Sequence, residues 1–328
     1  MADAAVYRAM AEGYQPTGPL GYRILIPLIA RYSPFPNEID FLCITALCTT
    51  LIIYNLIKLV EPFFTGNEWE KYLCFLWLQT GFCFSSFYDN PETDTAAFAA
   101  WFLVYRFFNK PILSACILCI ATAARETTLF IIPLFAIRTK SIAKTFWISF
   151  PALVVFFSIR AFVPGTNFFE YYFLNNHLFI ENFFNPHWLS QIITVFGIAP
   201  TALFMQRPKT RCFKNYKTEF FILLFFAVLS CCIAAALDRF IFILFPFILV
   251  PACSSLLQMS ALLKSLLLID YLLLLIAKFY FIKYWMINEW YEVLVYFSIL
   301  SIPVIISRIY FKNFSSQHSR LENPSLKR

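Results

Sequence analysis

The triplet Arg125-Glu126-Thr127 places a guanidinium and a carboxylate between two strongly apolar stretches, 111–124 and 128–137. A charged side chain at the depth of a bilayer is costly unless it faces protein, water or a substrate. If the flanking stretches lie in a membrane, the triplet is therefore a candidate site. Its alternative role is a structural ion pair that holds two helices together.

Three further groups of charged residues stand beside apolar stretches. They are Arg23, the acidic set Asp89, Glu92 and Asp94, and the pair Asp238-Arg239. Each group has a structural alternative. An arginine can anchor a segment at the membrane interface, an acidic residue can cap the next helix, and an Asp-Arg pair can simply end a span.

These residue types suit the chemistry of phosphate leaving groups. The planar guanidinium binds phosphate oxygens bidentately, and Arg23, Arg125 or Arg239 could stabilise charge on a departing phosphate. A carboxylate in the same cavity can take a proton from an acceptor hydroxyl. A phosphate, a lipid environment and a hydroxyl acceptor together indicate group transfer from a lipid-phosphate donor.

The composition predicts an all-α, polytopic membrane protein. Of 328 residues, 60% are hydrophobic and 14% are charged, and the mean hydropathy is +0.68. Soluble domains carry about 25% charged residues. We expect an external interfacial segment over 1–37, a transmembrane domain over 38–312 and a disordered cytoplasmic tail over 313–328.

About ten or eleven apolar stretches approach the length that crosses a bilayer, which is about 20 residues for a helix. Some are shorter, which is tolerated where a helix lines a cavity. The stretches are 38–60, 70–87, 95–108, 111–124, 127–138, 145–163, 188–205, 218–237, 240–258, 265–282 and 291–311.

The basic residues predict the orientation, because cytoplasmic loops of membrane proteins are rich in Lys and Arg. If the spans alternate, most basic residues share one face, which we assign to the cytoplasm together with the C-terminus. They are Lys58, Lys71, Arg106, Lys110, Arg138, Lys140, Lys144, Lys264 and the runs 207–217 and 308–328. All the candidate charged groups then fall on the opposite, outer face. The N-terminus also falls there, so we expect either that a first helix is missing or that the first span inserts the chain.

Cysteine and histidine give no ligand set. Cys116-x-x-Cys119 has metal-site spacing, but it lies in an apolar stretch with no second pair, so packing is the better interpretation. The three histidines form no cluster. We assign no metal ligands and no cofactor, although a lipid-phosphate donor is compatible with a divalent metal. No nucleic-acid-binding module is present.

Four short motifs resemble the GT-C superfamily of integral-membrane glycosyltransferases, in particular bacterial mannosyl- and arabinosyltransferases. They are D-x3-Y-x2-M-A-x-G ahead of PLGYRILIPL (Asp3 to Leu28), the acidic junction Asp89–Asp94, ARETTLFIIPL (Ala124–Leu134) and DRFIFILFP (Asp238–Pro246). The motifs are spread over much of the chain and do not specify a sugar.

The resemblance implies a multi-span helical enzyme in a bacterial inner membrane, with its active site outside. It also implies a polyprenyl-phosphate-linked sugar as donor, a glycan or lipid as acceptor, and inversion at the anomeric carbon. The base in that superfamily is an Asp in the first external loop, and Asp3 has the matching position. If the chain truly starts at Met1, Asp89 or Asp94 becomes the better base. The remaining candidates would bind substrate: Arg23, Glu92, Arg125, Glu126, Asp238 and Arg239.

Two other functions fit the same charged groups. A lipid or solute transporter or flippase would carry charge toward both faces of the membrane. A polysaccharide polymerase or ligase would share the lipid-linked donor but use a larger external loop than 164–187.

Overall fold

The computed structural model of the chain describes residues 2–14, 19–66, 68–81, 83, 93–163, 195–206, 208, 217–231, 244–283 and 289–322. Every regular element in these ranges is a helix, with thirteen α-helices, three 3-10 helices and no strand. The prediction of an all-α chain is confirmed for this part of the protein.

The elements have the following bounds. The α-helices are α1 (Ala2–Ala11), α2 (Leu25–Tyr32), α3 (Asn37–Val60), α4 (Glu68–Leu78), α6 (Asp94–Arg106), α7 (Pro111–Ala124), α8 (Ile132–Thr139), α9 (Ile142–Phe162), α12 (Ala199–Met205), α14 (Lys217–Cys231), α16 (Phe245–Gln258), α17 (Ala261–Lys283) and α18 (Glu289–Glu322). The 3-10 helices are η1 (Pro19–Tyr22), η2 (Glu61–Phe63) and η3 (Glu126–Ile131).

Each predicted apolar stretch overlaps a helix, but two expectations were wrong. The stretch 127–138 is not one helix, because its first half is the 3-10 helix η3. The segment after 312 is not a disordered tail up to Glu322, because α18 continues to that residue. No Gly or Pro follows Pro303 until Pro324, so no residue in this interval breaks the helix.

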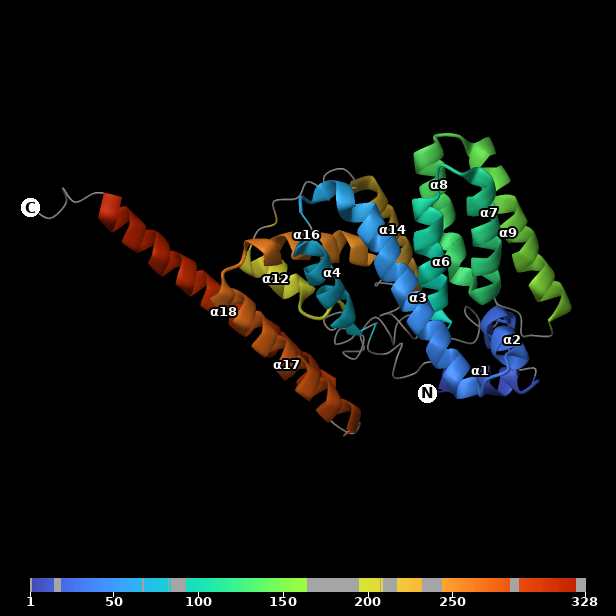
Figure 1. Cartoon of the computed structure of the whole chain (residues 1–328), viewed down its shortest axis with the longest axis horizontal. Coiled ribbons are helices and arrows are strands. Elements are labelled where there is room, and N and C mark those ends of the chain that lie inside the picture. The colour runs from blue at the N-terminus through green and yellow to red at the C-terminus, as the bar shows by residue number, and fades with distance from the viewer. Residues whose placement is uncertain are drawn as a thin grey trace, which may run out of the picture.

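Helices α6 to α9 run up and down in sequence and set the position of the site (Figure 1). Helix α6 packs against α3 and α7, and α9 packs against α7 and α8. The start of α6, the end of α7, the start of η3 and the end of α9 consequently lie at the same end of this bundle. Helices α1 and α2 lie beside that end (Figure 1).

A small apolar cluster fixes α1 and α2 in this position. It joins buried side chains of α1, α2, α3 and α7, namely Tyr7, Ala11, Ile26, Ala30, Phe41 and Ala124. The polar edge of Tyr7 therefore lies next to the last residue of α7, immediately before the charged triplet.

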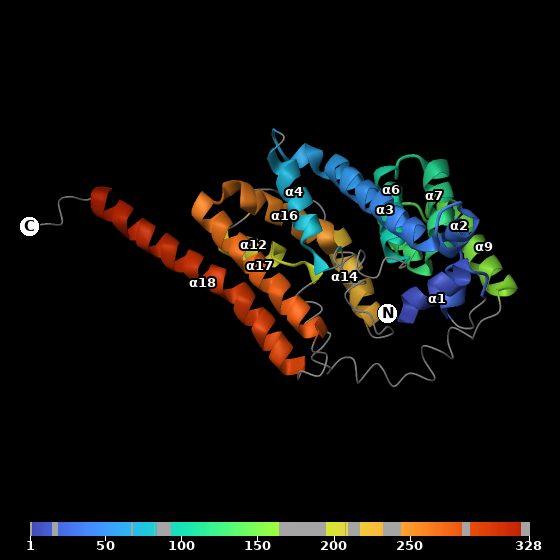
Figure 2. The same ribbon diagram turned by 60° about the horizontal axis from the view of Figure 1, so that its bottom comes forward.

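The second half of the chain packs against the first through aromatic side chains. The ring of Phe245 in α16 lies 4.7 Å from the ring of Phe102 in α6 and 5.1 Å from that of Trp77 in α4. Helix α16 also packs against α12, and α17 packs along α18 (Figure 2).

Two described segments, Asn37–Phe63 and Ile142–Phe162, are long and apolar enough to cross a membrane. Three shorter apolar segments are Pro111–Ala124, Phe245–Gln258 and Val293–Ile309. The core helix of a soluble protein can meet the same criteria, so the number of spans stays a prediction.

Gly197 lies close to a side chain of the first half of the chain. It has φ +54°, and a Cβ at this position would lie 1.8 Å from Oε1 of Gln79. That Oε1 accepts the Ile198 N–H at 2.7 Å, while Gln79 Nε2 donates to the Phe196 carbonyl at 3.1 Å. The Gln79 side chain thus holds α4 against the turn before α12.

We expect Gly197→Ala to lower the free energy of unfolding by about 2 kcal/mol, because it strains the backbone and expels the Gln79 side chain. Thermal unfolding in detergent would measure this. Gly66→Ala is the matched control: Gly66 also has positive φ, +73°, but no atom lies within 4 Å of its Cβ position. Equal losses in the two variants would contradict the role of Gln79.

Candidate functional site

The triplet lies where α7 ends in an extended residue. Arg125 has φ −162° and ψ 131°, and its N–H still donates to the Ala121 carbonyl at 2.8 Å. The Thr128 hydroxyl donates to the Arg125 carbonyl at 2.9 Å and fixes the turn into η3. Successive side chains of an extended backbone point to opposite sides. Arg125 and Glu126 accordingly bind different partners, and not each other.

Glu126 binds Arg23, which lies between η1 and α2. Arg23 Nη2 donates to Glu126 Oε1 at 3.2 Å and Arg23 Nε donates to Glu126 Oε2 at 3.4 Å. The remaining Nη1 of Arg23 donates to the Tyr7 hydroxyl at 2.7 Å. This bidentate arrangement fixes the plane of the guanidinium as well as its position.

Arg125 binds Asp94, the first residue of α6. Nη1 of Arg125 forms an ion pair with Oδ1 of Asp94, and the two residues are only 4% and 2% exposed. The negative carboxylate also suits the N-terminus of a helix. Nε of Arg125 is buried and has no hydrogen-bond partner among the described residues.

The two pairs act as one electrostatic cluster. Burial disfavours the Glu126 anion, but the positive charges of Arg23 and Arg125 outweigh burial and lower the pKa of Glu126 to about 2. Burial also raises the pKa of the Tyr7 phenol, against the opposing effect of the same two arginines. Although burial opposes its charged form, Glu126 and Tyr7 raise the pKa of Arg23 well above its usual value.

These charges define what the cluster can do. Two guanidiniums are held in fixed orientation by two carboxylates, and a neutral phenol donor or acceptor stands beside them. A carboxylate whose anion is stabilised by an arginine is a weak base. Glu126, whose pKa is lowered, is consequently better suited to orient Arg23 than to remove a proton, Asp94 is placed to orient Arg125, and the arginines are suited to bind an anion.

The structure brings together part of the predicted set. Arg23, Asp94, Arg125 and Glu126 form one cluster, although they come from three separate parts of the sequence. Asp3 lies in α1, one helical turn before Tyr7, but its side chain lies outside the described part of the protein. Four predicted residues lie outside the described residues altogether: Asp89, Glu92, Asp238 and Arg239.

Two residues at this end of the bundle were not predicted from the sequence. Tyr7 is one, although it is the tyrosine of the D-x3-Y motif. Arg160 is the other, in the last turn of α9, with its guanidinium carbon 4.7 Å from the centre of the Tyr22 ring. Arg160 thus lies against the ring of Tyr22, which precedes Arg23 in the sequence. The position of Arg160 at the end of an apolar stretch was the available signal.

The opposite end of the bundle is basic. Arg106 and Arg138 lie in the last turns of α6 and α8, and Lys144 lies in the first turn of α9. Arg106 donates to Asn55 at 3.1 Å, and Arg138 lies 3.7 Å from Glu219 in α14. The separation of this basic end from the ion-pair cluster follows directly from the alternating direction of α6 to α9.

Within the described residues, no group of three His, Cys, Asp or Glu side chains is arranged to hold a metal ion. Comparisons of the chain with protein-family models, with curated proteins and with solved structures find no match.

Tyr7→Phe tests the connection between α1 and Arg23. We expect it to lower the free energy of unfolding by about 2 kcal/mol, because a buried charged donor loses its acceptor. Thermal unfolding in detergent would measure the loss. Tyr14→Phe is the control, since Tyr14 lies just after α1 and is 62% exposed. A Tyr7→Phe protein as stable as the control would contradict the hydrogen bond.

Proposed function

We propose that this protein is a membrane glycosyltransferase that moves a sugar from a polyprenyl-phosphate-linked donor to a glycan or lipid acceptor on the outer face of a membrane. The observation that carries the proposal is the buried cluster of Arg23, Glu126, Arg125 and Asp94 at one end of the helices. Preorganised guanidiniums of this kind stabilise charge that develops on a departing phosphate.

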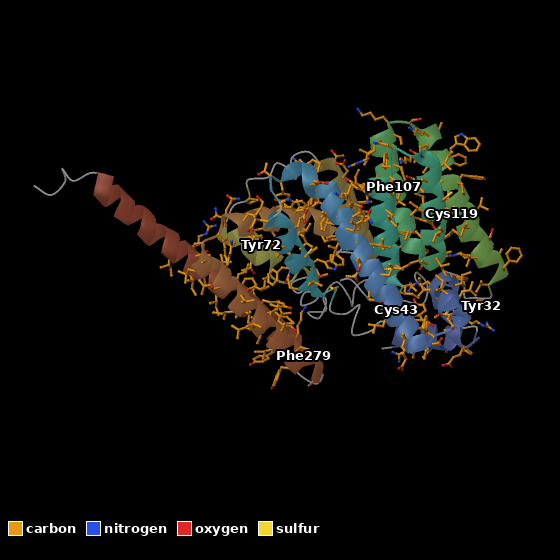
Figure 3. All side chains as sticks on the ribbon, in the orientation of Figure 1. Tyr32, Cys43, Tyr72, Phe107, Cys119 and Phe279 are labelled. Carbon is orange, nitrogen blue, oxygen red and sulfur yellow. The ribbon has the colours of Figure 1, made fainter. Side chains whose placement is uncertain are left out.

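The exposed surface supports a membrane environment. Large apolar side chains project from α9, α17 and α18, among them Trp147 at 71% and Phe297 at 64% exposed. Figure 3 shows such side chains along α17, with Phe279 labelled. Soluble monomers rarely expose contiguous apolar surface on this scale. A polytopic bundle of about ten or eleven spans would cover these faces with lipid.

The separation of charge supports the orientation. A basic end fits the cytoplasmic side of a membrane protein. The ion-pair cluster at the other end would then face the compartment in which polyprenyl-linked sugars are consumed. A transporter would carry its charged lining toward both ends.

Asp3 is the proposed base. Of the three predicted catalytic residues, Asp94 is engaged by Arg125, which leaves Asp3 and Asp89 as candidate bases. Asp3 lies one turn before Tyr7, whose hydroxyl contacts Arg23. A base at this position would act next to the proposed phosphate site.

We expect Asp3→Asn to reduce sugar transfer by about 100-fold without loss of folded protein, because the amide cannot accept the proton of the hydroxyl. The measurement is transfer from a panel of radiolabelled polyprenyl-phosphate sugars in membranes that contain the protein. Glu12→Gln is the control, since Glu12 is an exposed acidic residue of the same segment.

If Asp3→Asn stays active and Asp89→Asn does not, the base is Asp89 and not Asp3. If no donor of the panel is used while the purified protein moves a polyprenyl lipid or solute in proteoliposomes, the glycosyltransferase proposal is wrong.

A further inference from the structure

A groove of about 670 Å³ runs between α7 and α9, at the basic end of the bundle. Its volume lies within the range of small-molecule sites, which is about 300–1,000 Å³. Its walls are formed by Pro111, Ile112, Ala115, Cys116 and Cys119 of α7 and by Lys144, Trp147, Ile148 and Pro151 of α9.

The sequence explains why the two helices leave a groove here. Both helices begin at the basic end and run in the same direction. The residues of each helix that line the groove recur at i, i+3, i+4 and i+7, so they form one stripe on each helix. The α7 stripe carries the small side chains Ala115, Cys116 and Cys119, opposite Trp147 and Ile148 of α9. Figure 3 labels Cys119 in this region. The two cysteines of the Cys-x-x-Cys motif thus leave space for the groove because their side chains are small. Both thiols are free, and Cys116 is exposed.

The groove is apolar except at one end. Lys144, which is exposed, is the charged residue of its wall. Lys110 precedes Pro111 and Lys140 precedes α9, and both are also exposed. An apolar groove with a lysine at one end is complementary to an amphiphile with an acyl chain and an anionic head.

We propose that this groove binds one acyl chain of an anionic phospholipid, with Lys144 at the lipid phosphate. The proposal rests on the membrane embedding argued above and not on sugar transfer. The site is separate from the ion-pair cluster, because α7 has 14 residues and its ends are about 20 Å apart. The lipid would fill the space between two helices of the bundle at the cytoplasmic side.

Trp147 provides a native reporter, since it lines the groove. The full-length protein would be reconstituted in vesicles that contain bromine-labelled phosphatidylglycerol or bromine-labelled phosphatidylcholine. The chain has seven tryptophans, so the quenching of Trp147 is obtained by subtracting the fluorescence quenching measured for Trp147→Phe from that of the wild type. We expect the anionic lipid to occupy the groove about fivefold more tightly than the zwitterionic lipid.

Lys144→Gln should abolish this preference, whereas Lys71→Gln, an exposed lysine of α4, should keep it. Cys116→Phe fills the groove and should remove the quenching difference, whereas Ile120→Phe, on α7 outside the groove, should not. Equal quenching by both lipids, or a preference that survives Lys144→Gln, would overturn the proposal. A lipid preference in a protein without transferase activity would contradict only the proposed function.

Discussion

Replacing Arg125 with methionine is expected to lower the free energy of unfolding by about 4 kcal/mol, because the buried Asp94 carboxylate loses the guanidinium of its ion pair. Asp94 is 2% exposed and begins α6, so water cannot easily replace the guanidinium. The measurement is thermal unfolding of purified protein in detergent at neutral pH. Lys71→Met is the control, since it breaks an exposed 3.5 Å pair with Glu68 and should change little.

The double variant Asp94→Leu/Arg125→Met separates a structural role from a chemical one. Replacing both members of a buried pair with apolar side chains is often neutral or stabilising, so most of the lost stability should return. If the protein is the proposed glycosyltransferase, sugar transfer should nevertheless remain about 1,000-fold below the wild type, because the phosphate of the proposed donor loses a fixed guanidinium. A stable and fully active double variant would show that the pair only joins α6 to α7.

Most of the apolar helices could be located from the sequence, whereas α1 and α2 lie in the segment 1–37, which was predicted only as an interfacial segment. Apolar stretches such as 111–124 are bounded by charged residues and by prolines that begin a helix, and α7 has those bounds. The 3-10 start of the stretch 127–138 could not be predicted, because it depends on the Thr128 hydroxyl that binds the Arg125 carbonyl. Helix α18 extends past its apolar part because no Gly or Pro follows before Pro324. The prediction of a disordered tail relied on the polar composition of 313–328 and gave too little weight to this absence of helix breakers.

The members of the cluster were partly predictable, but their pairing was not. The charge pattern predicts that Arg23, Asp94 and Arg125-Glu126 share one side of the molecule. The sequence analysis left open a structural ion pair at Arg125-Glu126, whereas each of these residues binds a residue from a distant element. The backbone at Arg125 is extended and separates the two side chains, and this conformation cannot be deduced from the residue types alone.

This pairing gives the site its rigidity. Glu126 joins η3 to the start of α2, and Arg125 joins the end of α7 to the start of α6. Three parts of the chain thus meet at two adjacent residues. A substrate phosphate at Arg125 would encounter a guanidinium already held in place, so little ordering would accompany binding.

Glu126→Gln should lower the free energy of unfolding by about 3 kcal/mol at neutral pH, and the loss should depend on pH in a defined direction. The pKa of Glu126 is about 2 in the folded protein against 4.5 as its ordinary value. A carboxyl with a lowered folded pKa contributes stability that is complete above its unfolded pKa. About 2.5 pH units correspond to about 3 kcal/mol.

This contribution should disappear as the pH falls from about 4.5 to about 2, where Glu126 becomes protonated in the folded protein as well. Other carboxyls titrate in the same window, so the informative quantity is the difference between the wild type and Glu126→Gln, followed by thermal unfolding at several pH values. That difference should shrink toward pH 2, whereas Glu68→Gln, at an exposed site, should parallel the wild type. A difference that stays constant with pH would mean that Arg23 does not stabilise an ionised Glu126 and that the cluster lacks its proposed charge.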